Sequence, residues 1–313
     1  MGSVFIPAMK KEGYPAGFAG ALTAVSGTLA PMIPPSIILI VYGATFGVSI
    51  AALFAAGLSL ALLIAVLYSL MAYILSRRYD VPSHPRPPVS EVWGALKAAL
   101  PSLGMPVVVL GGILGGFFSP TEAAAIAAAY GLILTVVVYR TIDGPGLWRV
   151  LLQTSLTTAA IMILVGAALM LTYVMSIRHI PMHTMAFLLG ITGSPIPLIL
   201  LILVILFIAG LFIDRTANVL MFGAIIIPVF THQAGFSPVH TAMIIVMALG
   251  IGHLTPPVGG TLLATSLVGR VSVIEITRYI WPFILLEIAI TLLVVFVPAI
   301  SETLPRLLGL GGL

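Results

Sequence analysis

Apolar residues occur in long runs along this chain, separated by short polar stretches. An α-helix needs about 20 apolar residues to cross the hydrocarbon core of a bilayer. Four runs reach that length without a break: residues 49–75, 120–139, 151–176 and 279–300. Because a single apolar run satisfies its backbone hydrogen bonds in lipid only as a helix, these runs predict plain transmembrane helices in an all-α polytopic membrane protein.

Four other apolar regions are interrupted by prolines, glycines or charges. They are residues 16–47, with the pair Pro34-Pro35; residues 101–118, rich in glycine; residues 239–268, with the pair Pro256-Pro257; and residues 196–230, with Asp214 and Arg215. An interior proline removes a backbone donor and breaks a helix. We therefore expect a discontinuous helix at each proline pair.

The region 196–230 differs from the others because charge lies near its middle. Gly210, Asp214, Arg215 and Asn218 fall there, and a charged side chain at membrane depth is costly and usually functional. This pattern predicts a re-entrant helical hairpin with a polar tip. Two short spans are the alternative.

Basic residues indicate the orientation of the chain. The polar stretch 76–101 holds four of them between Arg77 and Lys97, and loops rich in Lys and Arg stay in the cytoplasm. Within this stretch, residues 90–100 are expected to form a short interfacial helix. Counting spans from this loop places residues 231–237 on the outer side.

Composition agrees with a membrane protein and excludes other classes. The chain is 60% hydrophobic and 7% charged, whereas soluble domains carry about 25% charged residues. Its net charge is +4, but the basic residues are scattered between apolar runs and form no nucleic-acid-binding face. Cysteine is absent, which excludes disulfides and Cys-ligated metals.

Four landmarks occur twice in the same order, about 222 residues apart. The first copy is Ile6-Pro7, Gly13-Tyr14, Pro34-Pro35 and Val48-Ser49, and the second is Ile227-Pro228, Gly235-Phe236, Pro256-Pro257 and Val271-Ser272. The orientation count makes the two copies inverted. Inverted repeats with discontinuous helices are a secondary-transporter architecture, in which unwound backbone offers carbonyls to a cation and helix N-termini offer N–H groups to an anion.

Three motifs carry a resemblance to one family. They are Pro31-Met32-Ile33-Pro34-Pro35-Ser36, Ser119-Pro120-Thr121-Glu122-Ala123-Ala124, and Ile251-Gly252-His253-Leu254-Thr255-Pro256-Pro257-Val258-Gly259. From residue 1 to nearly residue 310, the chain resembles the DctM-like large membrane subunit of tripartite ATP-independent periplasmic (TRAP) transporters. The resemblance implies an elevator-type secondary transporter of the ion transporter superfamily, in the bacterial inner membrane.

The same resemblance implies a function and partners. Sodium is the coupling ion, no other cofactor is expected, and the cargo is an organic acid such as a C4-dicarboxylate or sialic acid. A periplasmic binding protein delivers the cargo, and a small four-helix membrane subunit braces the large one. The alternatives are a sodium-driven anion carrier without a binding protein, a membrane-embedded hydrolase and a purely structural subunit. The sequence offers no catalytic residues for a hydrolase.

The resemblance also implies two sodium sites where hairpin tips meet broken helices. Backbone oxygens around Ala30, Ile33 and Pro35 would form one site. The other would use Gly210, Gly252, Thr255 and Val258. Two residues depart from the usual family pattern, because Ala30 stands where glycine is common and His253 stands where an apolar residue is common.

Seven residues are candidates for contact with a carboxylate substrate. Those at the expected hairpin tip are Asp214, Arg215, Thr216 and Asn218, and those after the two helix breaks are Ser36, Thr261 and Thr265. For the charged pair the alternative is a local ion pair or a tip outside the hydrocarbon. For the hydroxyl residues the alternative is a hydrogen bond to their own helix.

Other polar residues have simpler interpretations. Ser119 and Glu122 have the spacing of a capping box, with an ion ligand as the alternative. Glu287 lies inside the last span, where an acid is expensive; we expect it to pair across helices or to be protonated. His179 and His183 have a metal-ligand spacing, but the intervening Pro181 argues against one continuous helix, and no metal site other than sodium is expected.

These expectations divide the chain into five parts. Residues 1–48 hold the end of a first hairpin and the first broken helix, and residues 49–100 hold a span and the cytoplasmic loop. Residues 101–194 form scaffold-type helices. Residues 195–275 hold the second hairpin and the second broken helix, and residues 276–313 hold the last span and a tail. Family members carry further residues before the stretch resembling residues 2–7. We therefore expect the chain to be a fragment or to have a misplaced start.

Overall fold

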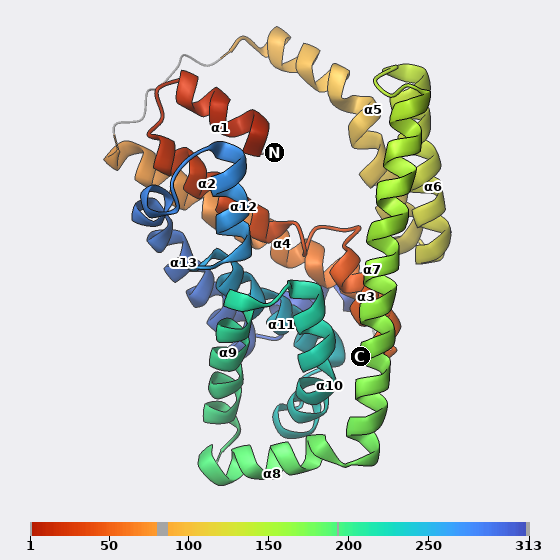
Figure 1. The fold of residues 1–313 in the computed structure, drawn as a ribbon, viewed down its shortest axis with the longest axis vertical. Helices are drawn as coiled ribbons and strands as arrows, with labels where there is room; N and C mark the ends of the chain where they lie inside the picture. The colour runs from red at the N-terminus through yellow and green to blue at the C-terminus, as the bar shows by residue number, and fades with distance from the viewer. Residues whose placement is uncertain (1, 80–86, 193, 311–313) are drawn as a thin grey trace. The chain divides into compact units, whose positions relative to one another are not determined.

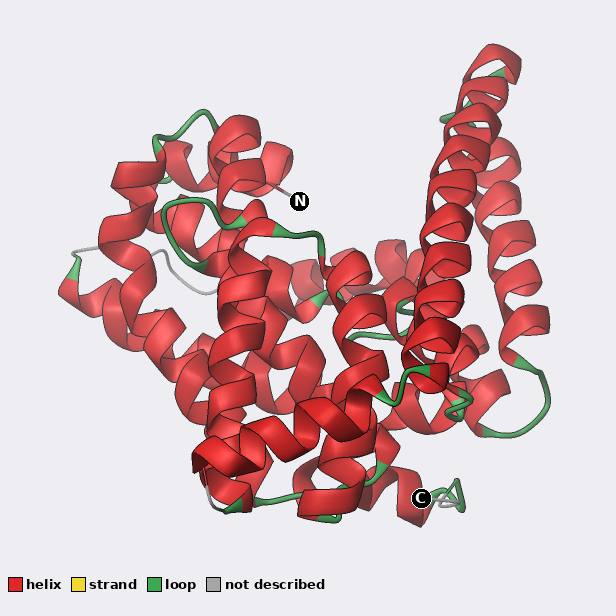
Figure 2. Ribbon diagram, turned by 60° about the horizontal axis from the view of Figure 1, so that its bottom comes forward, coloured by secondary structure: helices red, strands yellow, loops and turns green. Residues whose placement is uncertain are grey.

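The computed structural model describes residues 2–79, 87–192 and 194–310. These residues form fourteen α-helices and one π-helical segment, without a strand (Figure 2). The predicted all-α class is therefore confirmed for the described part of the chain. The expected cytoplasmic loop lies partly outside it, because Arg86 and its neighbours from residue 80 are not described.

The chain divides into two compact units, Met1–Pro82 with Ala168–Leu313, and Ser83–Ala167. The first unit holds the following helices, labelled in Figure 1: α1 Gly2–Lys11, α2 Ala16–Leu29, α3 Ile37–Phe46, α4 Ile50–Arg78, α8 Ile180–Thr192, α9 Pro195–Phe212, α10 Arg215–Ala234, α11 Pro238–Leu254, α12 Gly260–Gly269, α13 Val273–Phe296 and α14 Ala299–Leu307. The second unit holds α5 Val89–Leu114, α6 Pro120–Leu132, the π-helix η1 Ile133–Val138 and most of α7 Gly144–Ile177.

Six of the described helices are long and apolar enough to cross a membrane: α4, α5, α6 with η1, α7, α10 and α13. They include all four predicted plain spans, so the chain is a multi-pass membrane protein. The last span ends at Phe296 rather than residue 300. The helix stops there because Pro298 has no backbone N–H to continue it, and the short helix α14 follows.

The interfacial helix expected at residues 90–100 and the interrupted region expected at 101–118 are wrong. The structure has one continuous helix, α5, which runs through Pro101 and Pro106. Each proline removes a single donor, and the surrounding apolar helix retains the rest of its hydrogen bonds. The helix ends at the glycine pair instead, where Gly116 adopts a left-handed φ of 73°.

The two predicted discontinuous helices are confirmed. Residues 30–36 separate α2 from α3, and residues 255–259 separate α11 from α12. The Pro34-Pro35 and Pro256-Pro257 peptide bonds are both cis. Each break therefore divides one apolar region into two half-helices.

The other landmarks of the repeat also hold equivalent structural positions. Pro7 lies inside α1 and Pro228 lies inside α10. Gly13 and Gly235 follow these helices with φ of 86° and 65°, conformations that glycine adopts without strain. Ser49 and Ser272 are the N-caps of α4 and α13. The two halves of the first unit are thus built from the same succession of elements.

The packing of the two halves is reciprocal. Helix α2 packs on α13 while α11 packs on α4, and α1 packs on α12 while α10 packs on α3. Each contact between a helix of one half and a helix of the other is therefore repeated by the equivalents of those two helices, which is the contact pattern of a pseudo-two-fold arrangement.

Helix α11 is the centre of the first unit. Every residue from Val239 to Leu254 is buried, and the helix contacts α9, α10, α13, α4, α2 and α12. A helix that is apolar around its whole circumference needs such an enclosed position. Its C-terminal end leads directly into the second break, where Thr255 and Gly259 are buried and Pro257 is exposed.

Candidate functional site

The tip of the predicted hairpin is a two-residue turn, Ile213-Asp214, between α9 and α10. Asp214 is the N-cap of α10, and its Oδ1 accepts hydrogen bonds from the backbone N–H of Thr216 at 2.8 Å and of Ala217 at 3.4 Å. The turn therefore uses one carboxylate oxygen of Asp214 to start a helix, as aspartate commonly does.

Asn218 closes the hairpin from inside. It is completely buried, and its Nδ2 donates to the carbonyls of Ala209 at 3.1 Å and Ile213 at 3.0 Å. These bonds join the last turn of α9 to the first turn of α10. Asn218 therefore holds the tip together, and it does not line the cavity described below.

The second helix break is a compact turn. The Oγ1 of Thr255 donates to the carbonyl of Ile251 at 2.7 Å, and its N–H donates to the carbonyl of Gly252 at 3.1 Å. A Cβ on Gly259 would lie 2.4 Å from the carbonyl oxygen of His253. Glycine is required at that position because the chain folds back on itself there.

Hairpin and break meet at two glycines. A Cβ on Gly252 would lie 2.5 Å from the carbonyl oxygen of Phe207 and 2.7 Å from Cα of Gly210. A Cβ on Gly210 would lie 2.8 Å from the carbonyl oxygen of Leu249. The backbones of α9 and α11 therefore touch without side chains between them, as small residues allow. The structure brings together these two members of the predicted second sodium set.

A cavity of about 620 Å³ opens beside the hairpin tip and the second break. Its lining comes from five helices and the turns between them: Ile38 from α3; Leu211, Phe212, Ile213, Asp214, Arg215 and Thr216 from the hairpin of α9 and α10; and His253, Val258, Gly260, Thr261, Leu263 and Ala264 from the second broken helix, α11 and α12. The volume is that of a small-molecule site. Four of the seven predicted substrate residues lie here, namely Asp214, Arg215, Thr216 and Thr261.

Arg215 gives the cavity a buried positive charge. Its side chain is 7% exposed, and its Nη2 donates to Oγ1 of Thr261 at 3.2 Å. This bond connects the hairpin tip to the first turn of α12. The expected alternative, an ion pair between Arg215 and the adjacent Asp214, is not among the contacts of the described residues, and Arg215 is directed to the broken helix instead.

The N-terminus of α12 adds backbone donors to the same wall. Its N-cap is Gly259, which has no side chain to cap the first turn. The N–H groups of a first helical turn have no intrahelical acceptor, and the helix dipole favours an anion near them. Gly260 and Thr261 of this turn line the cavity.

His253 is a cavity residue that sequence reasoning did not place in the site. Its Nδ1 lies 3.2 Å from the carbonyl oxygen of Leu249, and its ring lies against Gly260. The signal was its position in the break motif, where the resemblance led us to expect an apolar residue. It brings a polar ring into the wall beside Arg215 and Thr261.

Two other candidates, Ser36 and Thr265, do not reach the cavity. The Oγ of Ser36 donates to the carbonyl of Pro31 at 2.6 Å and accepts from the N–H of Leu39 at 3.4 Å, so it caps α3. Thr265 is buried in α12 and does not line the cavity. Ser36 and Thr265 therefore lie outside the cavity wall, as Asn218 does.

The first predicted sodium set lies on the loop between α2 and α3. Ala30 has a right-handed conformation, with φ of −55° and ψ of −40°, so this position does not require the glycine that the resemblance led us to expect. Ile33 and Pro35 are exposed. None of the three lines the cavity.

Two other expectations from the sequence are confirmed. Ser119 and Glu122 form the capping box at the start of α6, with reciprocal hydrogen bonds. His179 has a left-handed φ of 51° and α8 begins only at Ile180, so His179 and His183 do not share one helix. The described residues contain no group of three or more His, Asp or Glu that could hold a metal ion.

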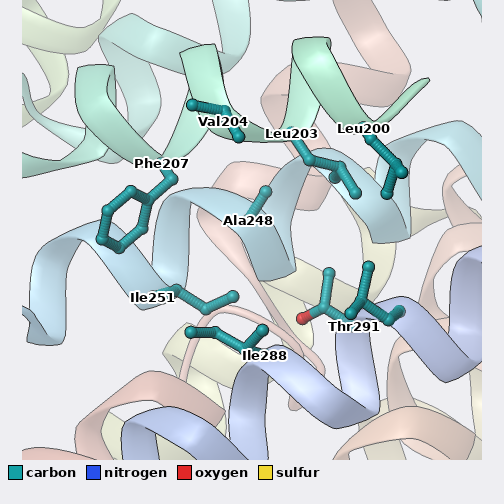
Figure 3. Close-up of a pocket in the computed structure, with 9 residues that line it drawn as sticks. Leu200, Leu203, Val204, Phe207, Ala248, Ile251, Ile288 and Thr291 are labelled. Atoms are coloured by element: carbon teal, nitrogen blue, oxygen red, sulfur yellow. The ribbon is translucent and has the colours of Figure 1, made fainter. Parts of the chain in front are cut away.

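A second cavity, of about 230 Å³, lies between α9, α11 and α13 (Figure 3). Apolar side chains such as Leu203, Phe207 and Ile251 point into it. The single polar lining residue, Thr291, donates its hydroxyl to the carbonyl of Glu287 at 2.8 Å. This cavity therefore has no free polar group with which to orient an organic acid.

Comparison with known proteins gives a consistent result. Residues 1–300 match the family described as "Tripartite ATP-independent periplasmic transporter, DctM component". The chain is 33% identical over 310 residues to the C4-dicarboxylate TRAP transporter large permease protein DctM of Pseudomonas aeruginosa, covering 99% of this chain and 72% of the relative.

Two further relatives have other substrates in their names. The ectoine/5-hydroxyectoine TRAP transporter large permease protein UehC of Ruegeria pomeroyi is 37% identical over 305 residues, which cover 96% of this chain and 70% of the relative. The sialic acid TRAP transporter large permease protein SiaM of Vibrio cholerae is 34% identical over 312 residues, covering 99% and 73%. These relatives are transporter permeases and not enzymes.

Proposed function

Because this chain belongs to the DctM component family of tripartite ATP-independent periplasmic transporters, we propose that it takes up an organic acid in symport with sodium, through the cavity at the hairpin tip. The single observation that carries the proposal is the convergence of Arg215, Thr261 and the uncapped start of α12 on that cavity. A buried guanidinium, a hydroxyl and free N–H groups together form a site for a carboxylate.

The substrate class follows from the cavity lining, which contains both apolar side chains and hydrogen-bond donors. Leu211, Phe212 and Ala264 provide apolar lining, and the same hairpin and α12 also provide the donors Arg215 and Thr261. A volume of about 620 Å³ admits a small organic acid but does not select one. C4-dicarboxylates, sialic acid and ectoine each carry a carboxylate, so we propose that this common group binds at Arg215 and the start of α12.

Sodium is proposed to bind backbone oxygens at the second break, around Gly210, Gly252, Thr255 and Val258. Hard cations are held by carbonyl and hydroxyl oxygens. The direct backbone contact of Gly210 with Gly252 supports this assignment, because it brings carbonyl-bearing turns of two elements together. A corresponding site is proposed at Ala30, Ile33 and Pro35 of the first break.

The coupling we propose is ordering of the hairpin tip by sodium. With the ion bound, the tip and break hold Arg215 against Thr261 and present the anion site. The loaded unit then crosses the bilayer in an elevator movement, with a small membrane subunit as brace and a periplasmic binding protein delivering the substrate at the inner membrane. A ligand that binds one state better shifts the population toward it, so sodium and substrate favour each other.

Uptake into proteoliposomes tests the proposal. The chain is reconstituted with the small subunit and binding protein of its system, and radiolabelled succinate, sialic acid and ectoine are offered with and without an inward sodium gradient. We expect sodium-dependent uptake of at least one of them. Thr261→Val is expected to reduce uptake, whereas the matched control Thr277→Val is not, because Thr277 bonds only its own helix, to Val273.

Three outcomes would contradict parts of the proposal. Equal uptake with and without a sodium gradient would show that transport is not coupled to sodium. Equal uptake without the binding protein would favour a carrier that works alone. Equal uptake by wild-type and Thr261→Val chains, with all three substrates, would show that the substrate carboxylate does not bind at this cavity.

A further inference from the structure

Glu287 is a buried acid that the proposed transport cavity does not use. It lies in the middle of α13 and has no exposed surface. In the described part of the chain neither of its carboxylate oxygens has a hydrogen-bond partner. An isolated carboxylate in an apolar interior is strongly unfavourable unless it is neutralised, so this group needs a positive partner.

The surroundings of Glu287 come from three other helices. Its Oε1 lies 3.1 Å from where a Cβ on Gly250 of α11 would be, so glycine at that position leaves room for the carboxyl group. The hydroxyls of Thr28 on α2 and Tyr68 on α4 lie near its carboxyl group, although neither forms a hydrogen bond to it. These two hydroxyls lie 3.4 Å from each other, and Thr28 donates to the carbonyl of Val25.

Among the described residues, Arg215 and Tyr68 are the titratable groups that interact with the carboxyl group of Glu287. Arg215 makes no hydrogen bond to it, although the guanidinium Nε is itself buried and without a partner. The charge of Arg215 therefore reaches Glu287 only through space, while its Nη2 is engaged with Thr261. Arg215 does not satisfy the hydrogen-bonding needs of the acid.

We propose that Glu287, with Thr28 and Tyr68, forms a binding site for a monovalent cation, either a proton or Na⁺. It is separate from the two backbone sites at the helix breaks and does not depend on carboxylate uptake. A bound proton converts the carboxylate to a neutral acid, and a bound Na⁺ is held by the carboxylate and the two hydroxyl oxygens. Both occupants have the same effect, which is to neutralise the charge between α2, α4, α11 and α13.

Release of this cation would act on the hairpin tip. The carboxylate left behind attracts Arg215, whose hydrogen bond to Thr261 forms part of the cavity wall. Occupation of the Glu287 site and the position of Arg215 are therefore linked, and such linkage is reciprocal. The charge state of Glu287 on α13 is in this way linked to the position of Arg215 in the cavity wall.

Infrared spectroscopy of the full chain distinguishes the occupants, because a protonated carboxyl group absorbs at a higher C=O frequency than a carboxylate. The chain has six glutamates, and labelling them with carbon-13 shifts any glutamic acid band. The spectra are recorded near neutral pH in Na⁺ and in choline, and bound Na⁺ is counted separately by equilibrium binding of the isotope. The variants are Glu287→Gln and, as a matched control, Glu91→Gln at the exposed start of α5.

A label-sensitive acid band in Na⁺ and in choline, lost in Glu287→Gln but kept in Glu91→Gln, shows a proton at the site. A band seen only in choline, with one Na⁺ fewer bound by Glu287→Gln, shows Na⁺. No band in either salt, with equal Na⁺ binding by wild-type and Glu287→Gln chains, overturns the proposal. If Glu287→Gln does not fold, the labelled wild-type chain decides: a band in either salt supports the site, and none in both overturns it.

Discussion

A single methyl group at the crossing of α9 and α11 is expected to disturb both stability and sodium binding. In Gly252→Ala the new Cβ lies 2.5 Å from the carbonyl oxygen of Phe207 and 2.7 Å from Cα of Gly210. Both atoms belong to the backbone of the neighbouring helix, so no change of side-chain rotamer relieves the overlap. The two helices have to move apart.

The magnitude follows from two opposing effects. Overpacking a well-packed core costs about 1–3 kcal/mol, and a clash with backbone belongs at about 3 kcal/mol in that range. Alanine is more favourable than glycine inside a helix by about 0.5–1 kcal/mol. The net loss of stability is therefore about 2 kcal/mol.

The matched control is Gly166→Ala in α7. Its Cβ meets no atom within 4 Å, so only the helix-propensity gain applies, and the free energy of unfolding should stay equal or rise by about 0.5–1 kcal/mol. Thermal unfolding in detergent, followed by circular dichroism, compares the two variants with the wild-type chain. We expect Gly252→Ala to unfold at a clearly lower temperature and Gly166→Ala to unfold at an equal or higher one.

Sodium titration adds a second measurement to the same variants. Separating α9 from α11 moves the carbonyls proposed to bind the ion, so the Na⁺ concentration that half-protects Gly252→Ala against unfolding should rise about tenfold, the equivalent of about 1.4 kcal/mol. If Gly252→Ala is as stable as Gly166→Ala, the direct backbone contact is wrong. If it is destabilised but binds sodium as tightly as wild type, the ion does not bind at this crossing.

Three further substitutions test other contacts. Thr255→Val removes the hydroxyl proposed as a sodium ligand, so isotope binding should weaken about tenfold and recover in Thr255→Ser; unchanged binding would leave Thr255 with only its bond to Ile251. Asn218→Ala removes both hydrogen bonds that close the hairpin and should cost about 2 kcal/mol of stability, at about 1 kcal/mol per bond; an unchanged unfolding temperature would contradict that role. Ser119→Ala removes the N-cap of α6 and should cost about 1 kcal/mol without changing sodium affinity in a binding titration; a loss of sodium binding would favour the ion-ligand interpretation of this motif.

The sequence by itself determined the elements whose signals are local. Uninterrupted apolar runs predicted α4, α6 with η1, α7 and α13, because the bilayer sets their length. The pairs Pro34-Pro35 and Pro256-Pro257 predicted the two breaks, since adjacent prolines remove two consecutive donors. The charged residues in region 196–230 predicted the hairpin tip, and the repeated landmarks and motifs predicted the family.

Local signals failed where a residue's effect depends on its neighbours in space. A separate interfacial helix was expected at residues 90–100 and an interruption in the glycine-rich region 101–118, but one helix, α5, runs from Val89 to Leu114. It passes through Pro101 and Pro106 because the loss of one isolated donor is small beside the remaining hydrogen bonds of the helix. Seven polar residues near a break or tip were candidates for contact with substrate, and the sequence left a local structural role open for them. Their hydroxyl, amide and carboxyl groups bond to whatever acceptor or donor the fold brings within reach.

Only the tertiary structure decided which of these groups are free. Ser36 and Asn218 use their polar atoms to cap α3 and to close the hairpin, whereas Arg215 and Thr261 meet across the cavity from positions 46 residues apart. His253 lines the cavity, and the buried carboxyl group of Glu287 has no hydrogen-bond partner among the described residues. The physical reason is that hydropathy and proline act along the chain, whereas hydrogen bonding, burial and charge depend on which distant helices pack together.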